Sequence, residues 1–181
     1  MHEKLDYSLL KSKLKTDVNV QTQVYNDCYK RVYSSCLRIL NDQHYAEDFM
    51  HEAFIHAFKS IDSFRGESQL SSWICRIAIN KCLDQLKKRK VKIVFSDNWE
   101  AEGSTNPVIE YARDTSETDR IKQALNELPE GCRLIFNLHV LEEMDHAAIA
   151  KQLNIKEGSS RAQYARAKNK IKELLKSPSH G

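Results

Sequence analysis

The stretch that constrains the fold of this chain most strongly is residues 144–176, near the C-terminus. Its first part carries apolar residues at helical spacing, namely Ala147, Ile149, Ala150 and Leu153. Asn154 follows, and asparagine tolerates the left-handed backbone that a tight turn requires. The run from Gly158 to Ser160 suits the cap and first turn of another helix, which reaches about Leu175. The pattern therefore predicts two helices joined by a tight turn.

The second of these helices has two different sides. Residues predicted to face the core recur every three or four positions: Tyr164, Ala167, Ile171 and Leu174. The remaining positions are mainly basic or polar: Arg161, Gln163, Arg166, Lys168, Lys170 and Lys172. Arginine and glutamine contact base edges, and both lie near the start of the helix, which is typical of a helix-turn-helix. An ordinary helical hairpin with a solvated basic face is the alternative, and spacing alone does not exclude it.

The packing between these two helices is predicted to depend on an aromatic residue. Ser160 stands where many helix-turn-helix motifs place a branched apolar residue. The neighbouring Tyr164 is the larger side chain on the same side of the helix. We therefore expect Tyr164 to supply more of the contact.

Composition indicates an all-α protein of one medium domain or two small ones. The 181 residues include only 5 Gly and 3 Pro. The net charge is +3, but positive charge gathers at residues 81–92 and at the C-terminus, on either side of an acidic stretch at 97–119. Two basic patches separated by an acidic linker suggest two contacts with a polyanion.

The cysteines and the apolar segments exclude several classes of protein. Five cysteines, an odd number without a CxxC pair, are expected to be reduced and mostly buried. No apolar run has the length of a membrane span, and the N-terminus has no signal pattern, so we expect a cytoplasmic protein without membrane insertion.

The first half of the chain predicts an amphipathic helix within residues 1–17, to which we assign no function, and two core helices at 20–40 and 45–60. Glu47, Asp48 and Glu52 form an acidic patch on the helix at 45–60. No nucleophile or glycine-rich loop accompanies them, so they indicate a protein-contact face rather than a catalytic pair.

His51 and His56 resemble a metalloprotease signature only superficially. Zinc-binding histidines on a helix are four residues apart and share one face, whereas these two are five residues apart and point about 140° away from each other. The sequence predicts no metal site, no cofactor and no enzymatic activity.

A polar loop at residues 62–72 precedes a helix predicted from Trp73 to about Lys90. The loop contains Phe64, predicted to be exposed, and Ser71 or Ser72 is predicted to cap the helix. One side of the helix carries polar and basic residues: Arg76, Asn80, Lys81, Asp84 and Lys87. Such a surface suits single-stranded or opened nucleic acid. A core aromatic beside solvated lysines is the alternative, and the residue types leave both open.

These elements predict two small helical domains joined by a flexible acidic linker, the second ending in the helix-turn-helix. The expected divisions are an N-terminal extension at 1–19, a first domain at 20–95, the linker at 96–117, a second domain at 118–176 and a tail at 177–181. A short extended piece is expected at 91–95.

Three segments, in this order, resemble the extracytoplasmic-function (ECF) sigma factors of bacterial RNA polymerase. They are AEDFMHEAFIHAFKSIDSF, SSWICRIAINKCLDQLKKRK and ALNELPEGCRLIFNLHVLEEMDHAAIAKQLNIKEGSSRAQYARAKNKIKELL. The resemblance covers residues 20–175. It implies a non-enzymatic subunit that binds core polymerase, recognises −35 and −10 promoter elements, and helps open the −10 region.

The resemblance also implies roles for individual residues. Core-polymerase binding would involve Asp48, Glu52 and Phe54. The −10 element would be contacted by Phe64, Ser72, Arg76, Asn80, Lys87, Lys88, Arg89 and Lys90. The −35 element would be contacted by Ser159, Ser160, Arg161, Gln163, Tyr164 and Arg166.

The implied partners are promoter DNA, the clamp coiled coil and flap of core polymerase, and an anti-sigma factor of unspecified class. Ser160, Gln163 and His51 depart from the residues that the family often has at these positions. Two alternatives are a stand-alone helix-turn-helix regulator, which would bind duplex DNA without polymerase, and a helical hydrolase or metalloprotein.

Overall fold

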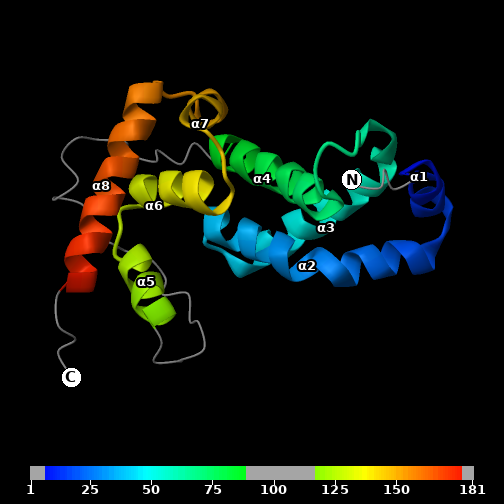
Figure 1. Cartoon of the computed structure of the whole chain (residues 1–181), viewed down its shortest axis with the longest axis horizontal. Helices are drawn as coiled ribbons and strands as arrows, with labels where there is room; N and C mark the ends of the chain where they lie inside the picture. The colour runs from blue at the N-terminus through cyan, green and yellow to red at the C-terminus, as the bar shows by residue number, and fades with distance from the viewer. Residues whose placement is uncertain (1–6, 89–116, 177–181) are drawn as a thin grey trace, which may run out of the picture. The chain divides into compact units, whose positions relative to one another are not determined.

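The computed structural model describes residues 7–88 and 117–176, and every regular element in these ranges is a helix (Figure 1). The chain divides into two compact units, Met1–Arg89 and Lys90–Gly181. The predicted all-α class is confirmed. The short extended piece expected at 91–95, residues 96–116 of the linker expected at 96–117 and the tail at 177–181 lie outside the described residues, as do residues 1–6, Arg89 and Lys90. Glu117, the last residue of the expected linker, begins a helix.

The first unit begins with α1 (Tyr7–Thr16) and α2 (Val18–Leu40), which meet at Asp17. The Asp17 carboxylate accepts hydrogen bonds from the backbone N–H groups of Asn19 and Val20, and so caps the start of α2. Asn41 ends α2 in a left-handed conformation, with φ 51° and ψ 36°. Asp42 then caps α3 (Gln43–Lys59) by accepting from the Tyr45 N–H. Short polar side chains therefore define each of these boundaries.

The loop after α3 contains a 3₁₀ turn, η1 (Ile61–Ser63), and leads into α4 (Leu70–Lys88). The predicted start of this helix at Trp73 is wrong, because the Trp73 N–H already donates to the Gln69 carbonyl at 3.1 Å. Ser71 and Ser72 consequently lie in the first turn of α4 and do not cap it.

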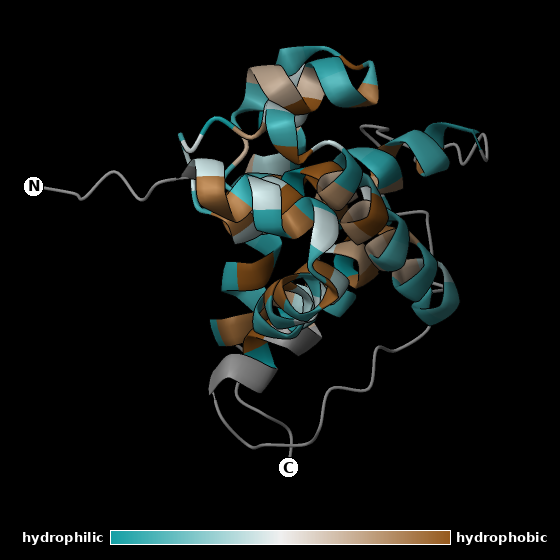
Figure 2. Cartoon of the chain, turned by 90° about the vertical axis from the view of Figure 1, so that its right-hand side faces the viewer, coloured by the Kyte–Doolittle hydropathy of each residue, from teal (hydrophilic) through white to brown (hydrophobic). Residues whose placement is uncertain are grey.

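The core of the first unit lies where α2, α3 and α4 pack against one another. Figure 2 shows hydrophobic and hydrophilic residues alternating around the helices, as expected for helices with one buried side. A second cluster contains Leu14, Ile61 and Phe64. The prediction that Phe64 is exposed is wrong, because its ring is only 1 % exposed.

All five cysteines are free and buried, as predicted. Burial, followed by the neighbouring Cys75, raises the pKa of the Cys28 thiol to about 11. Thiols with such raised pKa values form little thiolate at neutral pH and are poor nucleophiles. Cys28 therefore acts as a small apolar core residue.

Between residues 117 and 176, the second unit contains four α-helices, with a short π-helical turn after the second of them. These elements are α5 (Glu117–Asn126), α6 (Glu130–Phe136), the π-helical turn η3 (Asn137–Leu141), α7 (His146–Leu153) and α8 (Glu157–Lys176). Their core gathers around Ala167 and Ile171 of α8, against Ala124, Leu128 and Cys132. No helix among the described residues is long and apolar enough to cross a membrane.

Candidate nucleic-acid and polymerase interfaces

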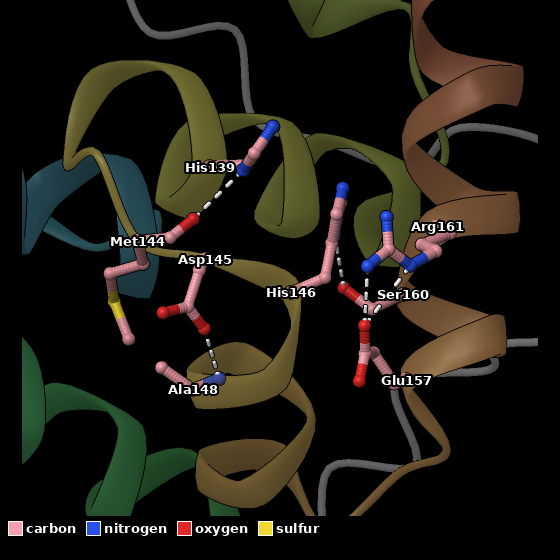
Figure 3. Close-up of polar contacts among 8 residues, drawn as sticks. All are labelled: His139, Met144, Asp145, His146, Ala148, Glu157, Ser160 and Arg161. Atoms are coloured by element: carbon pink, nitrogen blue, oxygen red, sulfur yellow. Dashed lines mark hydrogen bonds and ion pairs between the residues drawn. The ribbon is translucent and has the colours of Figure 1, made fainter.

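The turn between α7 and α8 has the geometry that the sequence predicts. Asn154 adopts φ 55° and ψ 47°, and its N–H donates to the carbonyl of Ala150. The Ile155 N–H donates to the same carbonyl at 3.0 Å. Asp145 caps α7 through a 2.6 Å bond from the Ala148 N–H (Figure 3). The predicted pair of helices with a left-handed asparagine between them is confirmed.

A buried polar contact joins the two helices. Nδ1 of His146, on α7, lies 2.9 Å from the hydroxyl oxygen of Ser160, on α8, and Figure 3 shows the two side chains pointing toward each other. Ser160 is 0 % exposed. It therefore holds α8 against α7 and is not placed to touch DNA, which corrects the expectation from the resemblance. Serine suits this position because its partner is histidine rather than an apolar side chain.

Aromatic rings complete the packing around this contact. The rings of His139 and His146 stack at 4.2 Å, and Tyr164 meets His139 edge-on at 4.7 Å. The His139 Nδ1 also lies 2.8 Å from the Met144 carbonyl oxygen. Tyr164 is thus a packing residue, as the spacing predicted.

Gln163 is buried, contrary to the expectation that it contacts bases. Its side chain is 3 % exposed, and its amide oxygen accepts a hydrogen bond from the Cys132 thiol at 2.8 Å. The physical reason is its position on α8, because residues 160, 163, 167 and 171 share the side that faces the rest of the unit. Cys132 is 31 residues away in the sequence, so no pattern among the neighbours of Gln163 predicts this contact.

Arg161 is the exposed base-reading candidate at the start of α8. Its guanidinium pairs with Glu157 one turn earlier, with a shortest distance of 2.5 Å. Both side chains are largely exposed, so the pair is weak and easily exchanged for another acceptor. Ser159 and Arg166 are half-buried, while Ala162, Ala165, Lys168 and Asn169 are exposed. Ala162 and Ala165, which the sequence pattern does not single out, are small enough to let another molecule approach this surface closely.

Helix α4 carries the second polar surface. Four of its residues are exposed and recur every three or four positions, namely Arg76, Asn80, Asp84 and Lys87, and Lys88 follows. Lys87 pairs with Asp84 at 3.1 Å, so one of the positive charges is partly compensated. Ser72 is half-buried at the start of this stripe.

The loop before α4 exposes different residues from those that the sequence predicts. Arg65, Glu67, Ser68 and Gln69 are exposed, and Gly66 takes φ 72° in the middle of the loop. Phe64 instead packs beneath the loop, with its ring 5.3 Å from that of Trp73. The aromatic residue therefore supports the loop, and the exposed polar residues are the ones available to a ligand.

Helix α3 presents the acidic face that the sequence predicted. Glu47, Asp48 and Glu52 are all exposed, and Glu52 forms an ion pair with Lys81 of α4 at 3.1 Å. Phe54 is 3 % exposed and packs against Tyr25 at 4.8 Å between ring centroids. Phe54 therefore shapes the face from below and does not form part of its surface, which corrects its expected direct contact.

Two family models match this chain, one in each unit. The Sigma-70 region 2 model matches residues 24–91, and the Sigma-70 region 4 model matches residues 118–171. The ECF RNA polymerase sigma factor SigW of Bacillus subtilis is 29 % identical over 164 residues, covering 83 % of this chain and 86 % of the relative. The ECF RNA polymerase sigma-E factor of Haemophilus influenzae is 30 % identical over 142 residues, covering 71 % and 75 %. This chain belongs to the ECF sigma factors.

Solved structures share the fold of this sigma factor. The sigma factor RpoE of Bartonella quintana, in complex with the anti-sigma factor NepR, aligns with a TM-score of 0.55 at 22 % identity, covering 86 % of this chain and 96 % of that one. CnrH, in complex with the cytosolic domain of CnrY, aligns with a TM-score of 0.51 at 17 % identity, covering 94 % and 97 %. Members of the family are non-enzymatic initiation factors that recognise promoters, and this function applies to the chain.

The burial of His146 is expected to make the stability of the sigma factor's second unit depend on pH. Burial, then the positive charges available on His139 and Arg161, lower the pKa of His146, while Glu157 and Asp145 oppose them. A histidine whose pKa falls on folding stabilises the fold above its unfolded pKa of about 6.5, and this stability is lost as the pH drops below that value. We expect amide protection in α7 and α8 to decrease from about pH 7.5 to about pH 5.5, measured by hydrogen exchange corrected for intrinsic rates.

Two variants separate this effect from general acid destabilisation. His146→Gln should flatten the pH dependence of protection in α7 and α8. His56→Gln changes an exposed histidine of the first unit and should leave the pH dependence of protection in α7 and α8 unchanged. An unchanged pH dependence in His146→Gln would contradict the assignment.

Proposed function

We propose that this ECF sigma factor recruits core RNA polymerase through α3, docks α8 in the −35 element, and uses α4 with its preceding loop to hold the opened −10 element. One observation carries the proposal. Each unit presents one exposed helix surface with base-reading and positively charged side chains, on α4 in the first and on α8 in the second. Two separate promoter boxes require two such surfaces.

The −35 contact would be made by the N-terminal half of α8 in the major groove, as is usual for the second helix of this motif. Arg161 is the residue most able to contact a base edge, since its side chain is exposed and its pairing with Glu157 is weak. Ser159 and Arg166 flank it. Ser160, Gln163 and Tyr164 would act indirectly, by fixing the orientation of α8 on the rest of the unit.

The −10 contact would combine base capture with phosphate binding. The loop residues 65–69, all exposed except the half-buried Gly66, lie directly before α4, and Asn80 is exposed farther along that helix. Bases in an unpaired strand are available for contacts with their edges, which suits the asparagine and the polar loop. Lys87 and Lys88 would bind phosphates at the end of α4, and Arg89 and Lys90 continue the basic run in the sequence.

The acidic face of α3 would bind the clamp coiled coil of core polymerase, with Asp48 at its centre and Glu52 beside it. The second unit would contact the flap. An anti-sigma factor is a further proposed partner, because the two similar solved structures are complexes with the anti-sigma factor NepR and with the cytosolic domain of CnrY. The class of the anti-sigma factor is left open.

Run-off transcription tests the proposal directly. Core RNA polymerase with the purified protein should transcribe from a subset of a promoter library, and neither component alone should do so. A stand-alone regulator would instead bind a specific duplex tightly without polymerase. Sequence-specific gel shifts by the isolated protein, together with no core-dependent transcription, would overturn the proposal.

Asn80→Ala should slow promoter opening without weakening initial promoter binding. A base contact of this kind is worth about 1 to 3 kcal/mol, so we expect roughly a tenfold slower appearance of permanganate-reactive thymines in the −10 region. Gln85→Ala is the matched control, since it truncates a half-buried residue on another side of the same helix. Normal opening by Asn80→Ala would rule out this role.

A further inference from the structure

Helix α1 packs against η1, the turn that leads into the loop before α4, residues 64–69, which we call the −10 loop after its proposed role. It contacts both η1 and α3 in addition to its neighbour α2. Figure 1 shows α1 beside the connection between α3 and α4. Two independent sets of contacts, one apolar and one polar, make this attachment.

The apolar contact is made by Leu14. Its side chain is 0 % exposed and belongs to one buried cluster with Ile61 and Phe64. Phe64 in turn meets Trp73, on the first turns of α4, with a centroid distance of 5.3 Å. Continuous side-chain packing therefore extends from α1, beneath the loop, to α4, the helix that carries Asn80.

The polar contact joins two lysines of α1 to one residue of η1. Lys15 pairs with the Asp62 carboxylate at 2.6 Å, and Lys11 donates to the Asp62 backbone carbonyl at 3.3 Å. These groups are partly exposed, so each contact is weak by itself. Together they fix both the side chain and the backbone of the residue two positions before Phe64.

Helix α1 is tied to α2 near its C-terminal end. The Gln21 side-chain amide of α2 donates to the Leu14 carbonyl at 2.7 Å. The Asp17 N–H donates to the Lys13 carbonyl at 2.8 Å and so completes the last turn of α1 itself. The loop has an anchor at its far end, because Gln69 accepts the first hydrogen bond of α4. Its near end is held by the single 3₁₀ turn and by the cluster of Leu14, Ile61 and Phe64, against which Val20, Val24, Phe58 and Trp73 also pack. Because α1 supplies Leu14, the one fully buried residue of this cluster that lies outside η1 and the loop, the position of α1 helps to set where loop residues 65–69 start.

We propose that α1 positions the −10 loop, with Leu14, Lys11 and Lys15 as positioning residues that act through Ile61, Asp62 and Phe64. None of these three side chains needs to contact DNA. They keep Phe64 beneath the loop, so that the polar residues above it are presented in one conformation for base capture. This inference rests on the proposed role of the loop and α4 at the −10 element.

The main experiment compares two leucines of the same helix in full-length protein bound to core polymerase. Leu14→Ala removes the buried contact, and Leu9→Ala removes a side chain that is 58 % exposed. Opening rates at saturating holoenzyme are measured on duplex promoter and on a promoter with a pre-opened −10 region. We expect Leu14→Ala to open duplex roughly tenfold more slowly, to act almost normally on the pre-opened template, and to bind core with unchanged affinity. Leu9→Ala should match the unaltered protein on both templates.

Charge exchange provides a second test if Leu14→Ala folds poorly. Lys15→Glu and Asp62→Lys should each slow duplex opening by a factor of up to about five, since an exposed pair contributes little. The double variant re-forms the pair with reversed charges and should restore the rate. Slow opening in the double variant, or normal opening in both single variants, would overturn the proposal.

Asn80→Ala, measured in the same assay, separates this inference from the proposed function. Slow opening with Asn80→Ala but not with Leu14→Ala or the charge variants would refute the role of α1 and leave the −10 assignment in place. Normal opening with all of them would refute both. Equal losses for Leu14→Ala on both templates, with weakened core binding, would show that this variant folds poorly, and the charge exchange of Lys15 and Asp62 would then decide the proposal.

Discussion

Replacing Asp48 by Arg is expected to weaken binding of the sigma factor to core polymerase by at least about 100-fold, so that the two no longer copurify. Asp48 is exposed on α3 beside Glu47. Close charge pairs at protein interfaces are coupled by about 1.5 to 7 kcal/mol, and reversal replaces an attraction with a repulsion. Lys81 pairs with Glu52 at 3.1 Å and offsets part of its charge, so Glu52 compensates only in part. The measurement is a binding titration of labelled protein with core enzyme.

Asp27→Arg is the matched control for this prediction, because it makes the same charge change on an exposed residue of the same unit. Asp27 lies on the side of α2 opposite to Tyr25, whose hydroxyl contacts His51 of α3 at 3.3 Å. It should therefore retain nearly full affinity. Unchanged binding by Asp48→Arg, or an equal loss with Asp27→Arg, would remove the acidic face of α3 from the polymerase contact.

Arg161→Ala should lower transcription from the cognate −35 sequence by roughly 5- to 150-fold, and much less from a promoter altered at the contacted base. The range corresponds to the 1 to 3 kcal/mol that a bidentate contact to a base edge contributes, about tenfold for each 1.4 kcal/mol. Loss of the ion pair with Glu157 adds little, because both partners are largely exposed. Run-off transcription on the two promoters, with equal holoenzyme, measures the difference.

Lys168→Ala is the comparison for a contact without base preference. Lys168 is exposed two turns after Arg161 on the same side of α8, where a positive charge would meet phosphate. Its loss should reduce transcription equally from both promoters. The same equal loss with Arg161→Ala would show that Arg161 binds phosphate and that another residue reads the base.

Most local boundaries could be predicted because short-range chemistry sets them. Asn154 and Asn41 each end a helix in the left-handed conformation, and Asp42 caps the helix that follows. The start of α4 was placed three residues too late, because Ser71 and Ser72 resemble caps in sequence although they lie inside the first turn. A capping residue is recognised by type, but neighbouring polar residues of the same type compete for the position.

The candidate site was predicted less completely than the fold. Arg161, Asn80 and Asp48 are exposed on the helices expected to carry them. Gln163, Ser160, Phe64 and Phe54 are instead buried. Residue type favours a surface position for glutamine and serine, but a buried partner reverses this preference, as Cys132 does for Gln163 and His146 does for Ser160.

The sequence by itself determined the helices, the turn between α7 and α8 and the family, since apolar periodicity, caps and motif order are properties of neighbouring residues. Tertiary structure alone decided which polar and aromatic side chains remain available to DNA and polymerase. It also decided that α1 packs against η1 and the loop before α4, through Leu14 and the lysines that contact Asp62. These outcomes depend on contacts between residues that are 14 to 51 positions apart in the sequence. At such separations, close packing and the need of buried polar groups for hydrogen bonds determine which residues meet. No pattern among neighbouring residues predicts these partners.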